Sequence, residues 1–158
     1  MPARAIPVEP VFRTASEQEV WARLVRTLDD DAVVLANVRF TDLHKDHELD
    51  LVVMLPGAGI VVVEVKGGSV WVDEQGGWWQ RSGAGSRRIH PVDQARDGKY
   101  AMRTYVEADP RWQGRTRVRW GHAVVTPYTS LADDFATPDC PRWMVHGRED
   151  QDDLAGRI

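Results

Sequence analysis

A glutamate stands inside the most apolar stretch of this 158-residue sequence, the run VVVEVK that ends at Lys66. Glu64 occupies a position where the packing of a buried strand favours an apolar side chain. Burial of an ionised carboxylate is costly unless a cation, a metal or strong hydrogen bonds compensate it. Lys66 lies two residues further along and therefore on the same face of a strand. The two residues fit either a structural ion pair or a reactive centre.

A second acid, Asp50, precedes the apolar run LVVML, and the turn sequence Pro-Gly-Ala-Gly separates this run from the one that contains Glu64. Two apolar runs around such a turn predict an antiparallel hairpin. Pairing of Leu55 with the residues after the turn places Asp50 opposite Glu64 or Val65. Two adjacent carboxylates repel each other unless a cation lies between them, and oxygen ligands suit Mg²⁺ or Mn²⁺. The hairpin therefore predicts a metal site beside Lys66.

Glu17 is a third acid in an unexpected position. Residues 14–28 have the apolar spacing of an amphipathic helix, and a helical wheel places Glu17 on the apolar stripe. We therefore expect its carboxylate to face inward. A capping box, in which Thr14 and Glu17 bond each other's backbone, is the alternative, and Ser16 with Glu19 competes for that role.

An amide and two groups of arginines complete the polar residues of interest. Gln94 lies in the first turn of a predicted helix, close to its buried face, where a structural or a catalytic role fits. Arginine and tryptophan side chains suit phosphates and unstacked bases, but also a solvated loop and a charged edge strand. The residues concerned are Arg81, Arg87, Arg88, Arg111, Arg115, Arg117 and Arg119, with Trp112 and Trp120 among them.

Helices and strands of both kinds must position these residues, so the sequence predicts a mixed α/β domain. Apolar periodicity and turn residues define the boundaries. The predicted elements are an extended lead-in over residues 1–13, helices over 14–28 and 91–108, strands over 32–40, 49–55 and 60–66, a hairpin of strands over 70–73 and 78–81, a glycine-rich loop over 81–88, late strands over 116–126 and 143–146, and the start of a further helix near the end.

Composition limits the class of protein. With 42% hydrophobic residues, the chain has enough apolar material for one domain with its own core. The net charge of -4 excludes a general positive field, so any binding of nucleic acid must be local. The single cysteine, Cys140, excludes a disulfide framework and favours a reducing compartment such as the cytoplasm. No signal peptide or membrane span is evident, so we expect a soluble domain without a membrane partner.

The polar residues together resemble the nuclease-related domain, NERD, a branch of the PD-(D/E)XK nuclease superfamily. The superfamily signature is an acid on one strand and acid-x-lysine on the next, here Asp50 and then Glu64-Val65-Lys66. The run HELDLVVMLPGAGIVVVEVKGG, the segment SEQEVWARL around Glu17 and the GGWWQ hairpin are similar to those of the family. The segment HPVDQ, which ends at Gln94, is similar to its Asn-Pro-x-x-Gln motif, with His90 in place of the asparagine. The resemblance covers most of the chain.

This resemblance implies a restriction-endonuclease-like fold, with a central mixed sheet flanked by helices, and a Mg²⁺- or Mn²⁺-dependent nuclease that hydrolyses DNA rather than RNA. The lysine would orient or deprotonate the attacking water, and the amide would orient that water or a phosphate oxygen. The implied catalytic set is Glu17, Asp50, Glu64, Lys66 and Gln94, of which Asp50, Glu64 and Glu17, with the Val65 carbonyl, would hold the metal.

Family members are often fused to helicase or kinase modules. The chain stops at Ile158 in a segment typical of a helix start, so we expect residues 14–158 to be an N-terminal nuclease domain of a longer protein, such as a helicase. One alternative is a non-catalytic module of the same fold that binds or targets nucleic acid. Another is a purely structural role for the ion pair.

Two further features are given less weight. His44 and His47, beside Asp46 and Glu48, have looser spacing than a zinc site, and a polar loop is the preferred interpretation. Cys140 has no base placed near it and is interpreted as an incidental thiol. The sequence also lacks the motifs of serine hydrolases, nucleotide hydrolases and dinucleotide-binding proteins.

Overall fold

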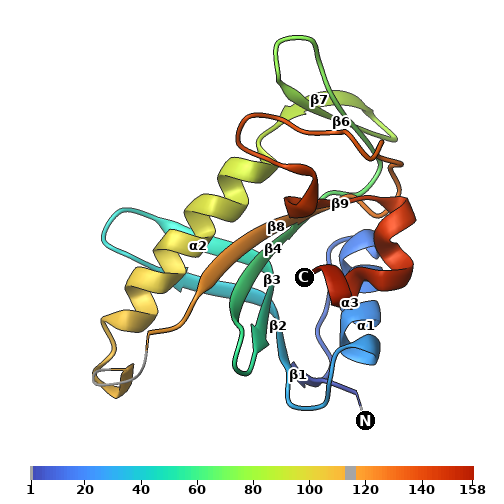
Figure 1. Ribbon diagram of the computed structural model, residues 1–158. Coiled ribbons are helices and arrows are strands. Elements are labelled where there is room, and N and C mark those ends of the chain that lie inside the picture. Colours follow the sequence, from blue (N-terminus) through green and yellow to red (C-terminus); the bar gives the residue numbers. More distant parts are fainter. Residues whose placement is uncertain (1, 113–116) are drawn as a thin grey trace.

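A six-stranded mixed sheet forms the centre of the protein (Figure 1). The computed structural model describes residues 2–112 and 117–158. Strand β3 runs antiparallel to both of its neighbours, and the other adjacent pairs are parallel. The order across the sheet is β1 (Arg4–Ile6), β2 (Val33–Thr41), β3 (Asp46–Leu55), β4 (Gly59–Val65), β8 (Trp120–Val125) and β9 (Val145–His146). The predicted mixed α/β class, with helices flanking a central sheet, is confirmed.

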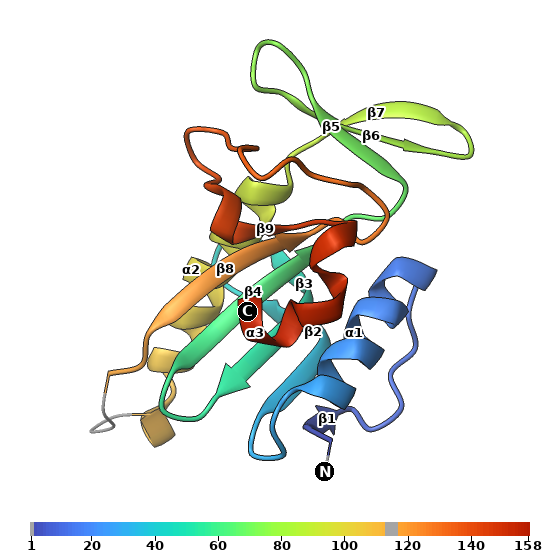
Figure 2. The ribbon, with the colours of Figure 1, turned by 45° about the vertical axis from the view of Figure 1, so that its right-hand side comes forward.

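The two long helices cover opposite faces of this sheet (Figure 1). Helix α1 (Ala15–Thr27) buries Val20 and Leu24 against one face, as its apolar stripe predicts, and α2 (Pro91–Glu107) packs Met102 on the other. Both helices begin at the end of the molecule where β4 finishes (Figures 1 and 2). The N-termini of two helices therefore meet one end of the hairpin.

Short helical segments make up the rest of the helical structure. They are η1 (Pro110–Trp112), η2 (Arg142–Met144), η3 (Arg148–Asp153) and α3 (Leu154–Arg157), which packs near α1. In the part of the chain that the structure describes, no helix is both long and apolar enough to cross a membrane.

A second sheet of three antiparallel strands projects beyond the start of α2 (Figure 2). It consists of β5 (Ser69–Val72), β6 (Trp78–Ser82) and β7 (Gly85–Ile89). The prediction of a glycine-rich loop over residues 81–88 is therefore wrong for most of its length. The glycines instead form a tight turn, with Gly85 at a φ of 123°, and the chain pairs back from Ser82 onward. The inner face of this sheet buries Val70, Trp78 and Ile89.

Other boundaries differ from the sequence-based expectation in smaller ways. Within the lead-in, β1 pairs in parallel with β2. Strand β3 begins at Asp46, because residues expected in a polar loop pair with the end of β2. The late strands are shorter than predicted, since β8 begins at Trp120 and a 3-10 turn precedes β9. Residue 116 of the predicted strand and Arg115 lie outside the described residues.

The thiol of Cys140 lies in the core between the second sheet and α2 and is fully buried. Burial, with the charge of Asp139 in addition, raises the pKa of this thiol to about 12. Because the thiolate is the reactive form, we expect the native protein at pH 8 to react with Ellman's reagent at least about 100-fold more slowly than the unfolded chain. Equal rates would contradict this burial.

The imidazole of His146 on β9 is also fully buried, and burial lowers its pKa to about 4. The unfolded chain, with a histidine pKa near 6.5, therefore binds a proton before the folded protein does as the pH falls. The contribution of His146 to the free energy of unfolding is therefore complete above pH 6.5 and decreases toward pH 4. Urea unfolding at pH 7.5 and pH 4 should show that His146→Asn avoids about 2 to 3 kcal/mol of the loss seen in the wild type. Parallel profiles would contradict this assignment.

Candidate active site

The hairpin of β3 and β4 has the register that its turn predicts. Leu55 pairs with Gly59 and Leu51 pairs with Val63, so the next position of the same register sets Asp50 opposite Glu64. The ladder between the two strands ends before that position, whereas β3 remains paired with β2 as far as Asp46. The strands therefore separate at Asp50.

A side chain replaces the lost backbone partner at this point. The N–H of Val65 donates to Oδ2 of Asp50 over 2.9 Å. The pairing of β3 with β2 skips Asp50 and Asn37, and Asn37 has a φ of 53°, in the left-handed region that asparagine tolerates. The Asp50 carboxylate is thus fixed to the backbone of the residue between Glu64 and Lys66.

Glu64 and Lys66 lie on the same face of the chain, as their spacing predicts. The Nζ atom of Lys66 is 3.0 Å from Oε1 of Glu64, and the two side chains are only 13% and 10% exposed. Pairing of β4 with β8, in which Lys66 donates its backbone N–H to the Val125 carbonyl, holds this end of the chain in place. The structure therefore brings Asp50, Glu64 and Lys66 together at the end of one hairpin.

Burial and mutual repulsion perturb both carboxyl groups. Burial, and after it the charge of Glu64, raise the pKa of Asp50 to about 7 against the opposing hydrogen bond from the Val65 N–H. Burial also raises the pKa of Glu64, although the ammonium of Lys66 opposes this effect. One lysine thus does not compensate two buried carboxylates, and the site favours an additional positive charge.

Glu17 lies in the first turn of α1 and is half-buried. Oγ1 of Thr14 accepts its backbone N–H over 3.2 Å, which is one of the two hydrogen bonds of the capping box expected as the alternative. The carboxylate of Glu17 also raises the pKa of both Asp50 and Glu64, so its charge reaches the site. Glu17 therefore bonds Thr14 through its backbone N–H, and its carboxylate acts on Asp50 and Glu64 at the same time.

Gly67 allows α1 to come this close, a role that the sequence reasoning missed. A Cβ atom on Gly67 would lie 2.5 Å from Oγ of Ser16, the buried residue before Glu17. Any larger residue would push the start of α1 away from the end of β4. The glycine pair that follows Lys66 was the available signal in the sequence.

Gln94 lies beside the buried face of α2, as predicted, but it is exposed, so its amide does not face inward. The buried stripe of the helix passes through Val92, Ala95 and Gly98 instead and leaves the amide at the side. Gln94 nevertheless faces the site region, because it lines a cavity of about 250 Å³ together with Lys66. The remaining lining residues are Arg87, Arg88, Ile89 and His90.

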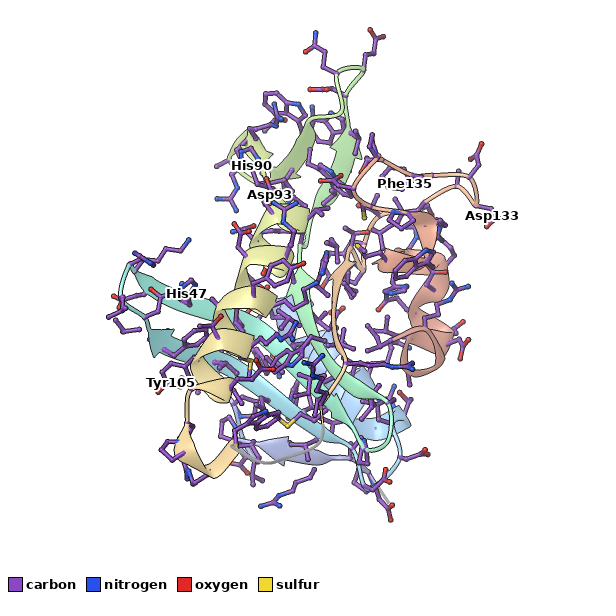
Figure 3. The ribbon with its side chains drawn as sticks, turned by 60° about the vertical axis from the view of Figure 1, so that its left-hand side comes forward. His47, His90, Asp93, Tyr105, Asp133 and Phe135 are labelled. Atoms are coloured by element: carbon purple, nitrogen blue, oxygen red, sulfur yellow. The ribbon has the colours of Figure 1, made fainter. Side chains whose placement is uncertain are left out.

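His90 is the N-cap of α2 and makes no capping hydrogen bond with its side chain. Figure 3 shows His90 and Asp93 at the start of α2, below the second sheet.

His47 lies well away from His90 and Asp93, on the hairpin of β2 and β3 (Figure 3). The Nε2 atom of His47 is 2.6 Å from Oδ2 of Asp42, and the imidazole ring of His47 stacks on Phe40. His47 therefore belongs to strand β3 and not to the predicted polar loop.

The donor set of the site suits a hard divalent cation. Asp50, Glu64 and Glu17 supply carboxylate oxygens, and the raised pKa values of the first two show that they lack sufficient positive charge. Among the described residues, no three His, Cys, Asp or Glu side chains already form a metal-binding group. The fit therefore rests on ligand chemistry and charge.

The family model for the nuclease-related domain matches residues 13–127. The chain belongs to this family. The NERD family is part of the PD-(D/E)XK-like nuclease superfamily, and the matched segment contains the complete predicted site, from Glu17 to Gln94. Comparisons with curated proteins and with solved structures give no significant match.

Proposed function

We propose that this NERD domain is a divalent-metal-dependent nuclease that hydrolyses phosphodiester bonds of DNA. The observation that carries the proposal is the separation of β3 from β4 at Asp50. It leaves an aspartate bonded to the backbone between Glu64 and Lys66, in the order acid, acid-x-lysine of the superfamily. A purely structural ion pair needs only Glu64 and Lys66, whereas a second buried acid raises the energy of the metal-free site.

Asp50 and Glu64, with the carbonyl oxygen of Val65, would hold Mg²⁺ or Mn²⁺, and Glu17 would bind it through water or hold a second ion. A cation held there would polarise the scissile phosphate and lower the pKa of a bound water. The protein contributes rigidity, because the hydrogen bond from Val65 fixes Asp50 before any substrate arrives.

Lys66 would orient the attacking water or accept its proton, and would offset the negative charge that develops on the phosphate. Its Nζ atom is already placed by Oε1 of Glu64. Gln94, which lines the same cavity as Lys66, would orient the water or a phosphate oxygen. The product would be a hydrolysed phosphodiester.

The direct test is cleavage of supercoiled, linear duplex and single-stranded DNA in Mg²⁺, in Mn²⁺ and in EDTA. We expect cutting with either metal and none in EDTA. The comparison of the three substrates also establishes which strand form the enzyme prefers. Absence of cutting with every substrate and metal, in a protein that folds normally, would contradict the proposal for this chain.

A non-catalytic nucleic-acid-binding module is the second candidate, and one observation favours it. The amine of Lys66 is engaged by Glu64, as in a structural ion pair. Calorimetric titration with Mn²⁺ separates the two functions, because a nuclease site binds the ion through Asp50 and Glu64 whereas a simple binding module does not. A module of that kind would bind DNA equally well after Asp50→Asn.

A further inference from the structure

Two arginines on the hairpin of β6 and β7 have no acidic partner in the described part of the chain. Elsewhere in the described chain, arginines such as Arg39, Arg96 and Arg103 pair with carboxylates. Within the described residues, Arg81 and Arg87 have no carboxylate at ion-pair distance, and their side chains bond Ser86 and Gln80 instead. In a chain of net charge -4, a guanidinium group without a carboxylate partner is available to an external anion, and the position of each arginine decides whether that anion could be the substrate.

The two arginines lie on opposite faces of the second sheet. Arg87 pairs with Gln80 across the strands, on the inner face that also buries Val70. Arg81 lies one position further along β6, on the outer face, where its guanidinium stands 5.7 Å from the centre of the Trp71 ring. Only Arg87 is therefore directed to the side of the sheet that faces the body of the protein.

A hydrogen-bonded chain holds Arg87 near the candidate catalytic lysine. Its Nε and Nη2 atoms both donate to Oε1 of Gln80, over 3.3 and 3.0 Å. Gln80 is buried, and its amide donates to the carbonyl of Gly67 over 2.8 Å. Gly67 directly follows Lys66. A buried amide thus fixes the guanidinium relative to the end of β4, which reduces the entropy that ligand binding must cost.

The cavity of about 250 Å³ beside Lys66 has a lining of one charge sign. Lys66 and Arg87 contribute cations and His90 and Gln94 contribute polar groups, whereas none of the lining residues is acidic. Arg88 also lines the cavity, but its charge acts on Asp73. The buried carboxylates of Asp50 and Glu64, at the hairpin end, are not among the residues that line this cavity. An anion next to the reacting phosphate would find complementary charge here.

We propose that Arg87 is a substrate-binding residue that holds a phosphate of the same DNA strand, next to the phosphate that is cut. The inference rests on the proposed nuclease function, whose site it extends onto β7. The planar guanidinium suits two phosphate oxygens, and Gln80 sets its orientation. In this proposal the substrate strand reaches the site along the inner face of the second sheet.

The test compares Arg87→Gln with Arg81→Gln, a matched pair on the same hairpin, by fluorescence anisotropy with a labelled single-stranded oligonucleotide and a labelled duplex in EDTA. We expect Arg87→Gln to weaken binding about tenfold and to reduce the slope of log affinity against log salt by about one. Arg81→Gln should leave both quantities close to the wild type. Arg87→Lys, which keeps the charge but not the fork, should restore the salt slope and only part of the affinity.

Three results would overturn the inference. Equal losses in Arg81→Gln and Arg87→Gln would show a diffuse positive surface without a built phosphate site. Wild-type affinity in Arg87→Gln, in a protein that still cuts DNA, would remove Arg87 from the substrate path and leave the proposed function intact. Weaker binding with an unchanged salt slope and a lower melting temperature would show that Arg87 only supports the fold through Gln80.

Discussion

Glu64→Gln is expected to reduce metal-dependent DNA cleavage by about 10³-fold or more. The substitution keeps the size of the side chain but removes its negative charge and one of the two oxygen atoms with which Glu64 could bind a cation. It also removes the charged partner of the Lys66 amine, which is 3.0 Å away. The measurement is the rate of plasmid nicking under single-turnover conditions in Mg²⁺ and Mn²⁺.

Glu74→Gln is the matched control for this variant. Glu74 is exposed in the turn between β5 and β6, so the same chemical change there should leave the rate within about twofold of the wild type. In both variants, Cys140 should react with Ellman's reagent as slowly as it does in the folded wild type. This result would show that each variant retains the core around Cys140. Cleavage by Glu64→Gln at a rate close to that of the control would exclude Glu64 from the chemistry.

Stability without metal distinguishes a reactive site from a structural ion pair. Because burial and the neighbouring acids disfavour the ionised form of Glu64, its neutralisation in EDTA should leave the free energy of unfolding within about 1 kcal/mol of the wild type. In this site Asp50 still interacts with Lys66 after the change. A structural ion pair without such a second acid would lose several times this amount, since Lys66 would remain buried and unpaired. Thermal stabilisation by Mn²⁺ should be present in the wild type and absent in the variant.

Much of this site could be predicted from the sequence because a short hairpin carries it. The Pro-Gly turn sets the register of β3 and β4, and the apolar runs on both sides leave few alternative pairings. Asp50 and Glu64 are then neighbours by geometry, whatever the remainder of the fold. The stripe of α1 is equally local, and Val20 and Leu24 are buried as it predicts.

The features that escaped prediction depend on contacts between distant segments. Strand β7 is exposed except at Ile89 and has no apolar alternation, so only its pairing with β6 reveals it as a strand. The same pairing places Arg81 and Arg87 on opposite faces of the second sheet. The exposure of Gln94 depended on which side of α2 meets the sheet, and the buried Lys99 shows that the helix does not follow a simple apolar stripe.

Gly98→Val is expected to destabilise the protein by about 3 kcal/mol or more. Gly98 lies in the middle of α2, where glycine disfavours a helix by about 1 kcal/mol relative to alanine, so a compensating reason for its presence is needed. That reason is the close packing of α2 on β3, because a Cβ atom at this position would collide with Cδ2 of the buried Leu49. Urea unfolding at pH 7.5 measures the cost.

Leu49 also gives this prediction a direct link to the site, since it immediately precedes Asp50. A helix forced away from Leu49 would displace the strand that carries Asp50 and the turn of α2 that carries Gln94. The double variant Gly98→Ala with Leu49→Ala should therefore recover at least about 1 kcal/mol relative to the sum of the two single changes. If the energies are additive, or if Gly98→Val is as stable as the wild type, contact with Leu49 does not explain the glycine, and the spacing between α2 and β3 is set elsewhere.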